Sequence, residues 1–306
     1  MLSSIGTRIS RNRDHDGGKR RNTVKNHPAM DLDCFDVGQL LGRGGFASVY
    51  RARNRRTGKV CALKIMEKET IRKHKMEDRV VQEVIIHARM RFPGIVRFSG
   101  HFEDEENVYM VLELCEGGNL YRLLKQHGPL REREAAKVIK QLLQSLQYMH
   151  ERGVIHRDLK LSNVLLERPS SPSLPMAKRF PSVAAGIEEK CRQSIPFDSP
   201  THSSTTNRTP LTIKLCDFGL AILLEHPDEE HFTLCGTPNY IAPEVASQRA
   251  HGYPADLWSA GCLFHSLVTG APPFEQGDIK ETLQCIVRGE YEEPSGLCSS
   301  DCLPSP

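Results

Sequence analysis

The ten residues from Val154 to Asn163 have the types and the spacing that phosphoryl transfer requires. Asp158 can accept the proton of an attacking hydroxyl, and Lys160 can offset the negative charge of the moving phosphoryl group. Asn163 can give its amide oxygen to Mg²⁺, which prefers oxygen ligands. The alternative is a solvated turn that is merely rich in polar residues. The rest of the sequence has to decide between the two interpretations.

A second metal ligand is predicted at Asp217, directly after the strand-like stretch 212–216. In the run Asp217-Phe-Gly, the carboxylate would contact metal, Phe218 would pack beneath the nucleotide site, and Gly219 would permit the turn. By itself, this tripeptide does not indicate a metal site. Its place after a strand, downstream of the first motif, makes it informative.

Lys64 ends a strand that has the apolar character of a buried one, so its ammonium group needs a partner. Glu83 is the candidate, because it lies on a predicted helix from Glu77 to Met90. The helix is predicted from apolar or small residues that recur at three- and four-residue spacing, namely Val80, Val84, His87 and Ala88. Such a pair would hold Lys64 toward the phosphates of a nucleotide. The alternative is that Glu83 is one more surface charge.

Short strands and glycines precede Lys64. A strand is predicted from Phe35 to Leu41, and Gly42 and Gly44 follow it at once. These glycines would let backbone amides approach phosphate oxygens closely. The same pattern suits an ordinary hairpin, whereas a dinucleotide-binding fold would require a helix next.

A hinge is predicted after the strand 108–115, where two glycines follow Glu116. Backbone groups of Glu113 and Cys115 could pair with an adenine edge, and Leu112 would form the wall behind it. Helices are then expected at 120–125 and 132–151, and a further apolar helix from Asp256. The predicted core face of the second helix comprises Ala136, Ile139, Leu142, Leu143, Leu146 and Met149.

Length and charge limit the classes of function. A chain of 306 residues suits one large domain or two lobes. The net charge of +3 gives no bulk affinity for nucleic acid, and no apolar run approaches the roughly 20 residues of a membrane span. Neither nucleic acid nor membrane is therefore expected as a partner. The ten cysteines lack metal-binding pairs and mostly fall in apolar runs, which indicates reduced, buried thiols in a cytosolic or nuclear protein.

Three segments are predicted to be disordered. Residues 1–32 are polar and basic, 168–210 are rich in Pro, Ser and Thr, and 292–306 lack periodicity. The first of them also carries weak resemblances to a mitochondrial presequence and to a nuclear import signal.

Residues 35–290 resemble a eukaryotic protein kinase, because all of these motifs occur in the expected order, with Ala242-Pro-Glu244 and Asp256 behind them. Two features resemble serine/threonine kinases rather than tyrosine kinases. They are Lys160, two residues after Asp158, and the stretch Gly236-Thr-Pro238. The glycine-containing segment 42–49, in which Ala47 follows Phe46, resembles that of the polo-like family. The stretch 233–244 resembles the same family. The stretches 79–87, 163–166 and 250–252 are most similar to its polo-like kinase 4 (SAK-type) branch.

The resemblance implies an α+β, two-lobed kinase fold, with a strand-rich lobe at 33–115 and a mainly helical lobe at 116–291. It implies ATP and Mg²⁺ as cofactors, catalytic roles for Lys64, Glu83, Asp158 and Lys160, metal contacts from Asn163 and Asp217, and an activating phosphate on Thr233. The implied ATP-binding residues are Leu41, Gly42, Arg43, Gly44, Gly45, Phe46, Ala47, Ser48, Val49, Ala62, Lys64, Leu112, Glu113, Cys115 and Leu165.

The same resemblance implies a biological setting. Protein substrates and self-association for trans-autophosphorylation are expected, in the cytoplasm and at the centriole, centrosome or basal body. The expected process is duplication of these structures, or cell division.

Two departures from the family pattern support an alternative function. The segment 168–210 is an insertion, and the chain stops before the last helices expected of the helical lobe and before any polo box. The missing helices would include the arginine expected to pair with Glu244. The alternative is accordingly a truncated, catalytically impaired fragment that acts as a nucleotide- or protein-binding module.

Overall fold

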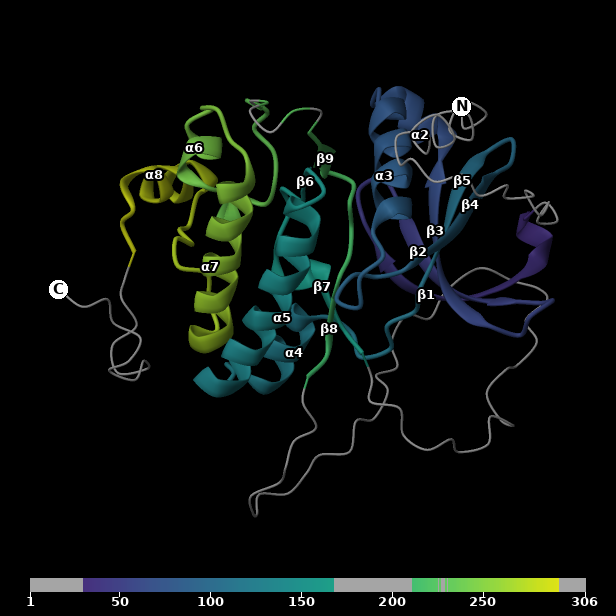
Figure 1. Ribbon diagram of the computed structural model, residues 1–306, viewed down its shortest axis with the longest axis horizontal. Helices are drawn as coiled ribbons and strands as arrows, with labels where there is room; N and C mark the ends of the chain where they lie inside the picture. The colour runs from purple at the N-terminus through teal and green to yellow at the C-terminus, as the bar shows by residue number, and fades with distance from the viewer. Residues whose placement is uncertain (1–29, 168–210, 225, 227–228, 230, 292–306) are drawn as a thin grey trace, which may run out of the picture. The chain divides into compact units, whose positions relative to one another are not determined.

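The computed structural model describes residues 30–167, 211–224, 226, 229 and 231–291, which form a strand-rich lobe followed by a mainly helical lobe (Figure 1). The expected α+β architecture with two lobes is confirmed. The predicted insertion at 168–210, the C-terminal tail at 292–306 and almost all of the N-terminal tail lie outside the described residues. Met30 and Cys34 already pack against the strand-rich lobe.

The strand-rich lobe is one antiparallel sheet in the order β1-β2-β3-β5-β4. Its strands are β1 (Phe35–Arg43), β2 (Ser48–Asn54), β3 (Val60–Glu67), β4 (Phe98–Glu103) and β5 (Asn107–Leu112). Strand β5 ends at Leu112, so the prediction of a strand through Cys115 was wrong at its end. Strand β4 and helix α2 (Lys68–Lys73) were not predicted. Only Phe102 is buried in β4, so this strand lacks the apolar run or alternation that would mark it in the sequence.

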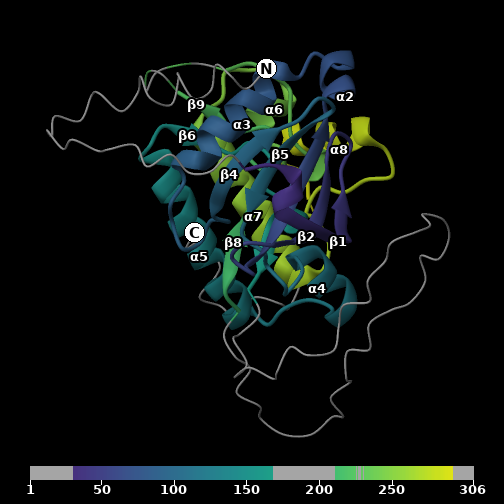
Figure 2. The same ribbon diagram turned by 90° about the vertical axis from the view of Figure 1, so that its right-hand side faces the viewer.

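Helix α3 (Glu77–Arg89) lies beside the sheet, next to β4 and β5 (Figures 1 and 2). Acidic residues occupy its first turn and basic residues its last, which suits the helix dipole. Val80, Val84 and His87 are buried as predicted, whereas Ala88 is half-buried. Glu83 is buried on the same helix, so its carboxylate needs a cationic partner.

The helical lobe contains α4 (Leu120–His127), α5 (Glu132–His150), α6 (Pro243–Ala246), α7 (Tyr253–Thr269) and α8 (Ile279–Arg288). Two small antiparallel sheets of two strands each accompany these helices: β6 (Val154–Ile155) pairs with β9 (Ile222–Leu223), and β7 (Val164–Leu166) pairs with β8 (Ile213–Leu215). Three 3₁₀ turns complete the described elements, at η1 (Leu32–Cys34), η2 (Leu161–Asn163) and η3 (Pro238–Tyr240).

The predicted core face of α5 is confirmed at Leu142, Leu146 and Met149, whereas Ile139 is only partly buried and the other two members of that face are exposed. Ala135 and Val138 are buried, whereas Leu143 is 41% exposed and Ala136 faces solvent. Neighbouring helical residues lie about 100° apart, so an apolar pair such as Leu142-Leu143 offers two possible faces. Packing against α7 selects the face that contains Leu142. Helix α7 begins at Tyr253 rather than Asp256, because proline is tolerated in a first turn.

Phe218 is fully buried and lies between α3 and the predicted catalytic loop, residues 154–163. Its ring centroid lies 4.5 Å from that of His87 and 5.5 Å from that of His156. His87 Nε2 lies 2.7 Å from the carbonyl oxygen of Val96, and burial lowers the pKa of His87 to about 4. A neutral His87 ring therefore packs on Phe218 at neutral pH.

The cysteines are less buried than predicted. Cys61 and Cys262 are buried, while the other five described cysteines are half-buried, and all seven are free thiols. Across the described ranges, no helix combines the length and the apolar character needed to cross a bilayer.

Candidate active site

The catalytic loop is fixed by Asp256, whose carboxylate is completely buried on α7. Its Oδ2 accepts a hydrogen bond from the backbone N–H of His156 at 2.9 Å, and its Oδ1 accepts one from the N–H of Arg157 at 2.9 Å. His150 Nε2 lies 2.8 Å from Oδ2. Arg157 has a φ of 65°, a strained conformation for a residue with a Cβ atom. The loop therefore keeps one backbone shape that presents Asp158.

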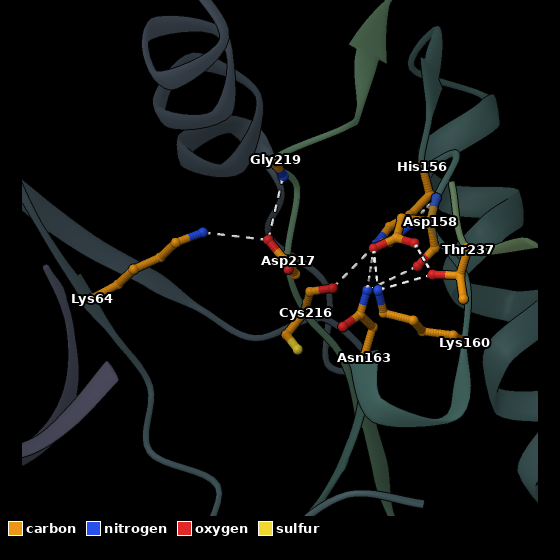
Figure 3. A network of polar contacts seen from close by, with 9 residues as sticks. All are labelled: Lys64, His156, Asp158, Lys160, Asn163, Cys216, Asp217, Gly219 and Thr237. Atoms are coloured by element: carbon orange, nitrogen blue, oxygen red, sulfur yellow. Dashed lines mark hydrogen bonds and ion pairs between the residues drawn. The ribbon is translucent and has the colours of Figure 1, made fainter. Parts of the chain in front are cut away.

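Asp158 is the centre of a compact polar network (Figure 3). Its Oδ2 accepts hydrogen bonds from Lys160 Nζ at 2.8 Å and from Asn163 Nδ2 at 3.0 Å. Its Oδ1 accepts one from the hydroxyl of Thr237 at 2.8 Å, and that hydroxyl in turn accepts one from Lys160 Nζ at 3.0 Å. A carboxylate held in this way can orient an incoming hydroxyl, with an ammonium group at the same point.

The pairing of β7 with β8 brings the two predicted metal ligands together. Val164 of β7 pairs with Leu215 of β8, and the N–H of Cys216 donates to the carbonyl oxygen of Asn163 at 2.9 Å. Asn163 therefore lies beside the start of the Asp217 segment. The left-handed backbone here belongs to Asp217, with a φ of 66°, and not to Gly219, which was expected to permit the turn.

These two side chains fit a divalent cation bound to phosphate. The amide nitrogen of Asn163 contacts both the carbonyl oxygen and the carboxylate of Asp158, so its Oδ1 is the atom left to face a metal. Asp217 presents a carboxylate that is 46% exposed. In the part of the chain that the structure describes, no group of three or more His, Cys, Asp or Glu side chains could hold a metal. Mg²⁺ held by one or two side chains usually takes its other ligands from phosphate and water.

Lys64 is fixed by two carboxylates. Its Nζ lies 2.6 Å from Oε1 of Glu83 and 3.3 Å from Oδ1 of Asp217. The Lys64 and Glu83 side chains are 13% and 6% exposed. Although burial opposes the effect, the charges of Glu83 and Asp217 raise the pKa of Lys64. The Lys64 charge is also the largest influence on Asp217 and lowers the pKa of that carboxyl to about 2, so both groups are ionised at neutral pH.

The predicted nucleotide-binding residues are divided among the turn between β1 and β2, the strands β1, β2, β3, β5 and β7, and the hinge after β5. Gly44 N–H closes this turn on the carbonyl oxygen of Ala47 at 2.8 Å. A Cβ atom on Gly42 or Gly45 would meet nothing within 4 Å, so the described protein atoms do not themselves require glycine there. Close approach of a ligand is a physical reason for glycine at such positions. The ring of Phe46 turns toward His74, with its centroid 5.1 Å away.

The other predicted contacts follow the sheet. Val49 pairs with Lys64 across β2 and β3, and Ala62 pairs with Leu112 across β3 and β5. Leu165 lies on β7. Leu41, Gly42 and Arg43 end β1, Gly45 and Phe46 lie in the turn, Ser48 begins β2, and Glu113 and Cys115 follow β5.

The hinge after β5 is attached to both lobes. Glu113 N–H donates to the carbonyl oxygen of Arg97 at 2.9 Å, and Gly117 N–H donates to that of Leu166 at 3.0 Å. A Cβ atom on Gly117 would lie 2.5 Å from the same Leu166 oxygen, so this glycine is required for the close approach. Gly118 has a φ of 77°, which also favours glycine.

Thr237 is the site residue that sequence reasoning missed as a functional group. The Gly236-Thr-Pro238 stretch served only as a mark of the kinase class, and its hydroxyl was assigned no partner. The structure places that hydroxyl between Asp158 and Lys160. The one available signal was its position in a motif downstream of the catalytic loop.

We expect Thr237→Val to lower kcat for phosphoryl transfer by about tenfold to a hundredfold, because Asp158 and Lys160 lose their shared partner. The KM for ATP should change little, since Thr237 contacts none of the predicted nucleotide residues. Thr237→Ser keeps the hydroxyl and serves as the control. Wild-type kcat in folded Thr237→Val protein would show that the hydroxyl does not position Asp158.

Comparisons with known proteins agree with this geometry. Residues 35–298 match the profile of the protein kinase domain. The chain is 39% identical to the serine/threonine-protein kinase PLK4 of Danio rerio over 264 residues, which are 86% of this chain and 24% of that protein. It is 38% identical to the PLK4 of Drosophila melanogaster over 267 residues, 87% of this chain and 29% of the relative.

A third relative, PLK4 of Aedes aegypti, is 38% identical over 269 residues, which cover 88% of this chain and 30% of that protein. The chain thus spans only 24% to 30% of the length of these relatives. The similarity coincides with the region that carries the two lobes and the site. This chain belongs to the protein kinase domain family.

Proposed function

We propose that the protein transfers the γ-phosphoryl group of ATP, with Mg²⁺, to serine or threonine hydroxyls of protein substrates. The observation that carries the proposal is the network of Lys160, Asn163 and Thr237 around Asp158, together with Lys64 and Asp217. Phosphoryl transfer needs little covalent chemistry from a protein and depends on positioning and electrostatic stabilisation. The site supplies charged groups for both.

Each group has a distinct task in this proposal. Lys64, held by Glu83, binds the phosphates of the nucleotide. Asn163 and Asp217 would hold the metal, which would neutralise the charge that develops on the phosphate oxygens. Asp158 orients the hydroxyl and accepts its proton. Lys160 contacts Asp158 directly, so its ammonium group would lie where the phosphoryl group passes.

The alternative, a binding module without catalysis, is not favoured. A protein that only binds nucleotide or another protein has no need of Lys160 and Thr237 gathered on the carboxylate of Asp158. The ion pair of Lys64 with Glu83 is formed as well.

Three substitutions test the activity. Lys64→Met, Asp158→Asn and Asp217→Asn should each lower phosphoryl transfer by at least roughly a thousandfold, because each removes charge that acts on the transition state. Circular dichroism and thermal melting should show that the folds persist. Transfer of ³²P from ATP to a generic protein substrate gives the rate, and near wild-type turnover in Asp158→Asn would refute the role of that residue.

We further propose that a phosphate on Thr233 orders the segment around it. Thr233 is exposed, and Cys235, two residues on, lines a small cavity with Arg157. Burial lowers the pKa of Arg157, and the nearby charge of Arg79 lowers it further. Arg157 Nε donates to the carbonyl oxygen of Leu220 at 2.8 Å, which leaves its terminal amino groups for a phosphate.

Thr233→Ala should lower activity by at least about tenfold, the equivalent of one charge-assisted hydrogen bond, whereas Thr233→Ser should retain it. Mass spectrometry of the active protein should find the phosphate. An unmodified Thr233 in active protein, with Thr233→Ala equally active, would contradict the proposal. Modification by a second copy would require transient self-association, detectable when kinase-dead protein is phosphorylated by the wild type.

The process that we propose is centriole or basal body duplication, or another step of cell division, in the cytoplasm and at these structures. The support is the resemblance of the motifs to the polo-like kinase 4 branch and the similarity to the PLK4 relatives. Tagged protein that is never enriched at centrioles in dividing cells would remove this assignment.

A further inference from the structure

Lys214 is a buried lysine on β8 to which the site as described assigns no task. Its side chain is 9% exposed, and its Nζ has three oxygen partners. These are the carbonyl oxygen of Pro93 at 2.9 Å, Oε2 of Glu113 at 3.2 Å and Oε1 of Glu167 at 3.4 Å. An ammonium group has three hydrogens to donate, so these three oxygens can use all of its capacity.

The position of this ammonium group is set by the loop between α3 and β4. Leu215 N–H donates to the carbonyl oxygen of Gly94 at 2.8 Å, and Val96 N–H donates to that of Leu215 at 2.9 Å. Strand β8 is therefore attached to the loop by two backbone bonds of Leu215 along one edge, while its other edge pairs with β7. Lys214 adds its own bond to Pro93 and is a fixed point from which Glu113 can be held.

Glu113 is the hinge residue that Lys214 holds. Oε2 of Glu113 forms an ion pair with Lys214 Nζ and accepts a hydrogen bond from the N–H of Arg97 at 3.1 Å. The N–H of Glu113 donates back to the carbonyl oxygen of Arg97 at 2.9 Å. Both the backbone and the side chain of Glu113 are thus restrained. Its carbonyl oxygen is one of the groups predicted to pair with adenine.

Strand register places Lys214 beside the rest of the nucleotide site. Lys214 is the direct partner of Leu165 in the pairing of β7 with β8, and directly opposed side chains of an antiparallel pair share a face. Leu165 is a predicted contact of the nucleotide, and Asp217 lies three residues beyond Lys214 in the chain. The strand that carries Lys214 therefore leads from the adenine end of the site to its metal end.

We propose that Lys214 is a positioning residue for adenine recognition, which acts by fixing the backbone of Glu113. The inference rests on the proposed function, because it assumes that this hinge binds a nucleotide. A carbonyl oxygen in a fixed place accepts from the exocyclic amine of adenine and opposes the carbonyl oxygen that guanine carries there. If Glu113 is less restrained, both the attraction for the adenine amine and the repulsion of the guanine carbonyl oxygen should weaken.

The preference for adenine over guanine distinguishes a positioning role of Lys214 from that of an ion pair that only stabilises the fold. A structural role predicts a lower melting temperature and equal losses for all nucleotides. Positioning predicts a loss confined to adenine nucleotides. The quantity to measure is therefore the preference for ATP over GTP.

The test uses the full chain with Mg²⁺, and isothermal titration calorimetry gives Kd for ATP and for GTP. Lys214→Met should raise the Kd for ATP about tenfold, the equivalent of about one hydrogen bond, whereas the Kd for GTP should stay the same or fall, because the opposition to guanine also weakens. The matched control is Glu167→Gln, which alters the more exposed of the two carboxylate partners and leaves Glu113 held. This control should keep the wild-type preference. Steady-state kinetics should show the Lys214→Met loss in the KM for ATP, with kcat changed by less than about twofold.

A folded Lys214→Met protein with an unchanged preference for ATP over GTP would overturn the proposal, as would a fall in kcat at unchanged Kd. If that variant does not fold, the double variant Lys214→Met/Glu113→Gln removes the unpaired carboxylate and must show the same adenine-specific loss. Failure of both variants to fold would assign Lys214 a structural role and refute positioning. Wild-type protein that binds no ATP would instead reject the proposed function.

Discussion

The ion pair of Lys64 and Glu83 is the interaction on which the rest of the site depends. Its atoms lie 2.6 Å apart, and both side chains are almost completely buried. Removal of two such ions from water costs several kcal/mol each, and their attraction does little more than repay that cost. The pair therefore adds little net stability. Its effect is geometric, because it ties α3 to β3 and directs the Lys64 ammonium group at Asp217.

The opposite side of the site depends on backbone strain that the helical lobe maintains. Arg157 and Asp217 have φ values of 65° and 66°, which cost on the order of 1–3 kcal/mol each for residues with a Cβ atom. The buried carboxylate of Asp256 holds the first, and the pairing of β7 with β8 holds the start of the segment that carries the second. The groups that act on a phosphate are in this way placed before any ligand arrives, as electrostatic catalysis requires.

Much of this arrangement could be predicted from the sequence because its signals are local. Lys64 ends an apolar strand, and Glu83 interrupts an apolar helical face, so each implies a charged partner before the fold is known. The helices α3 and α5 follow from the spacing of their apolar residues. The core face of α5 was predicted only in part, since adjacent apolar residues offer two faces and only tertiary packing selects one.

Long-range contacts account for most of what was missed. The hydroxyl of Thr237 meets Asp158 across 79 positions of sequence, and no local pattern marks such a pair. The partners of Lys214 are similarly distant, with Pro93 121 positions away. Strand β4 was not predicted because Phe102 is its only buried residue. Its extended conformation depends on pairing within the sheet, which no local pattern in the sequence shows.

The central claim is that the Lys64–Glu83 pair positions this site for phosphoryl transfer rather than stabilising the fold. Measurement of kcat and ATP affinity in Glu83→Gln tests it directly, because this variant keeps the shape of the side chain and removes its charge. A small displacement of Lys64 should lower kcat by roughly a hundredfold, while the Kd for ATP changes by less than about tenfold. A folded Glu83→Gln protein with wild-type kcat would contradict the account.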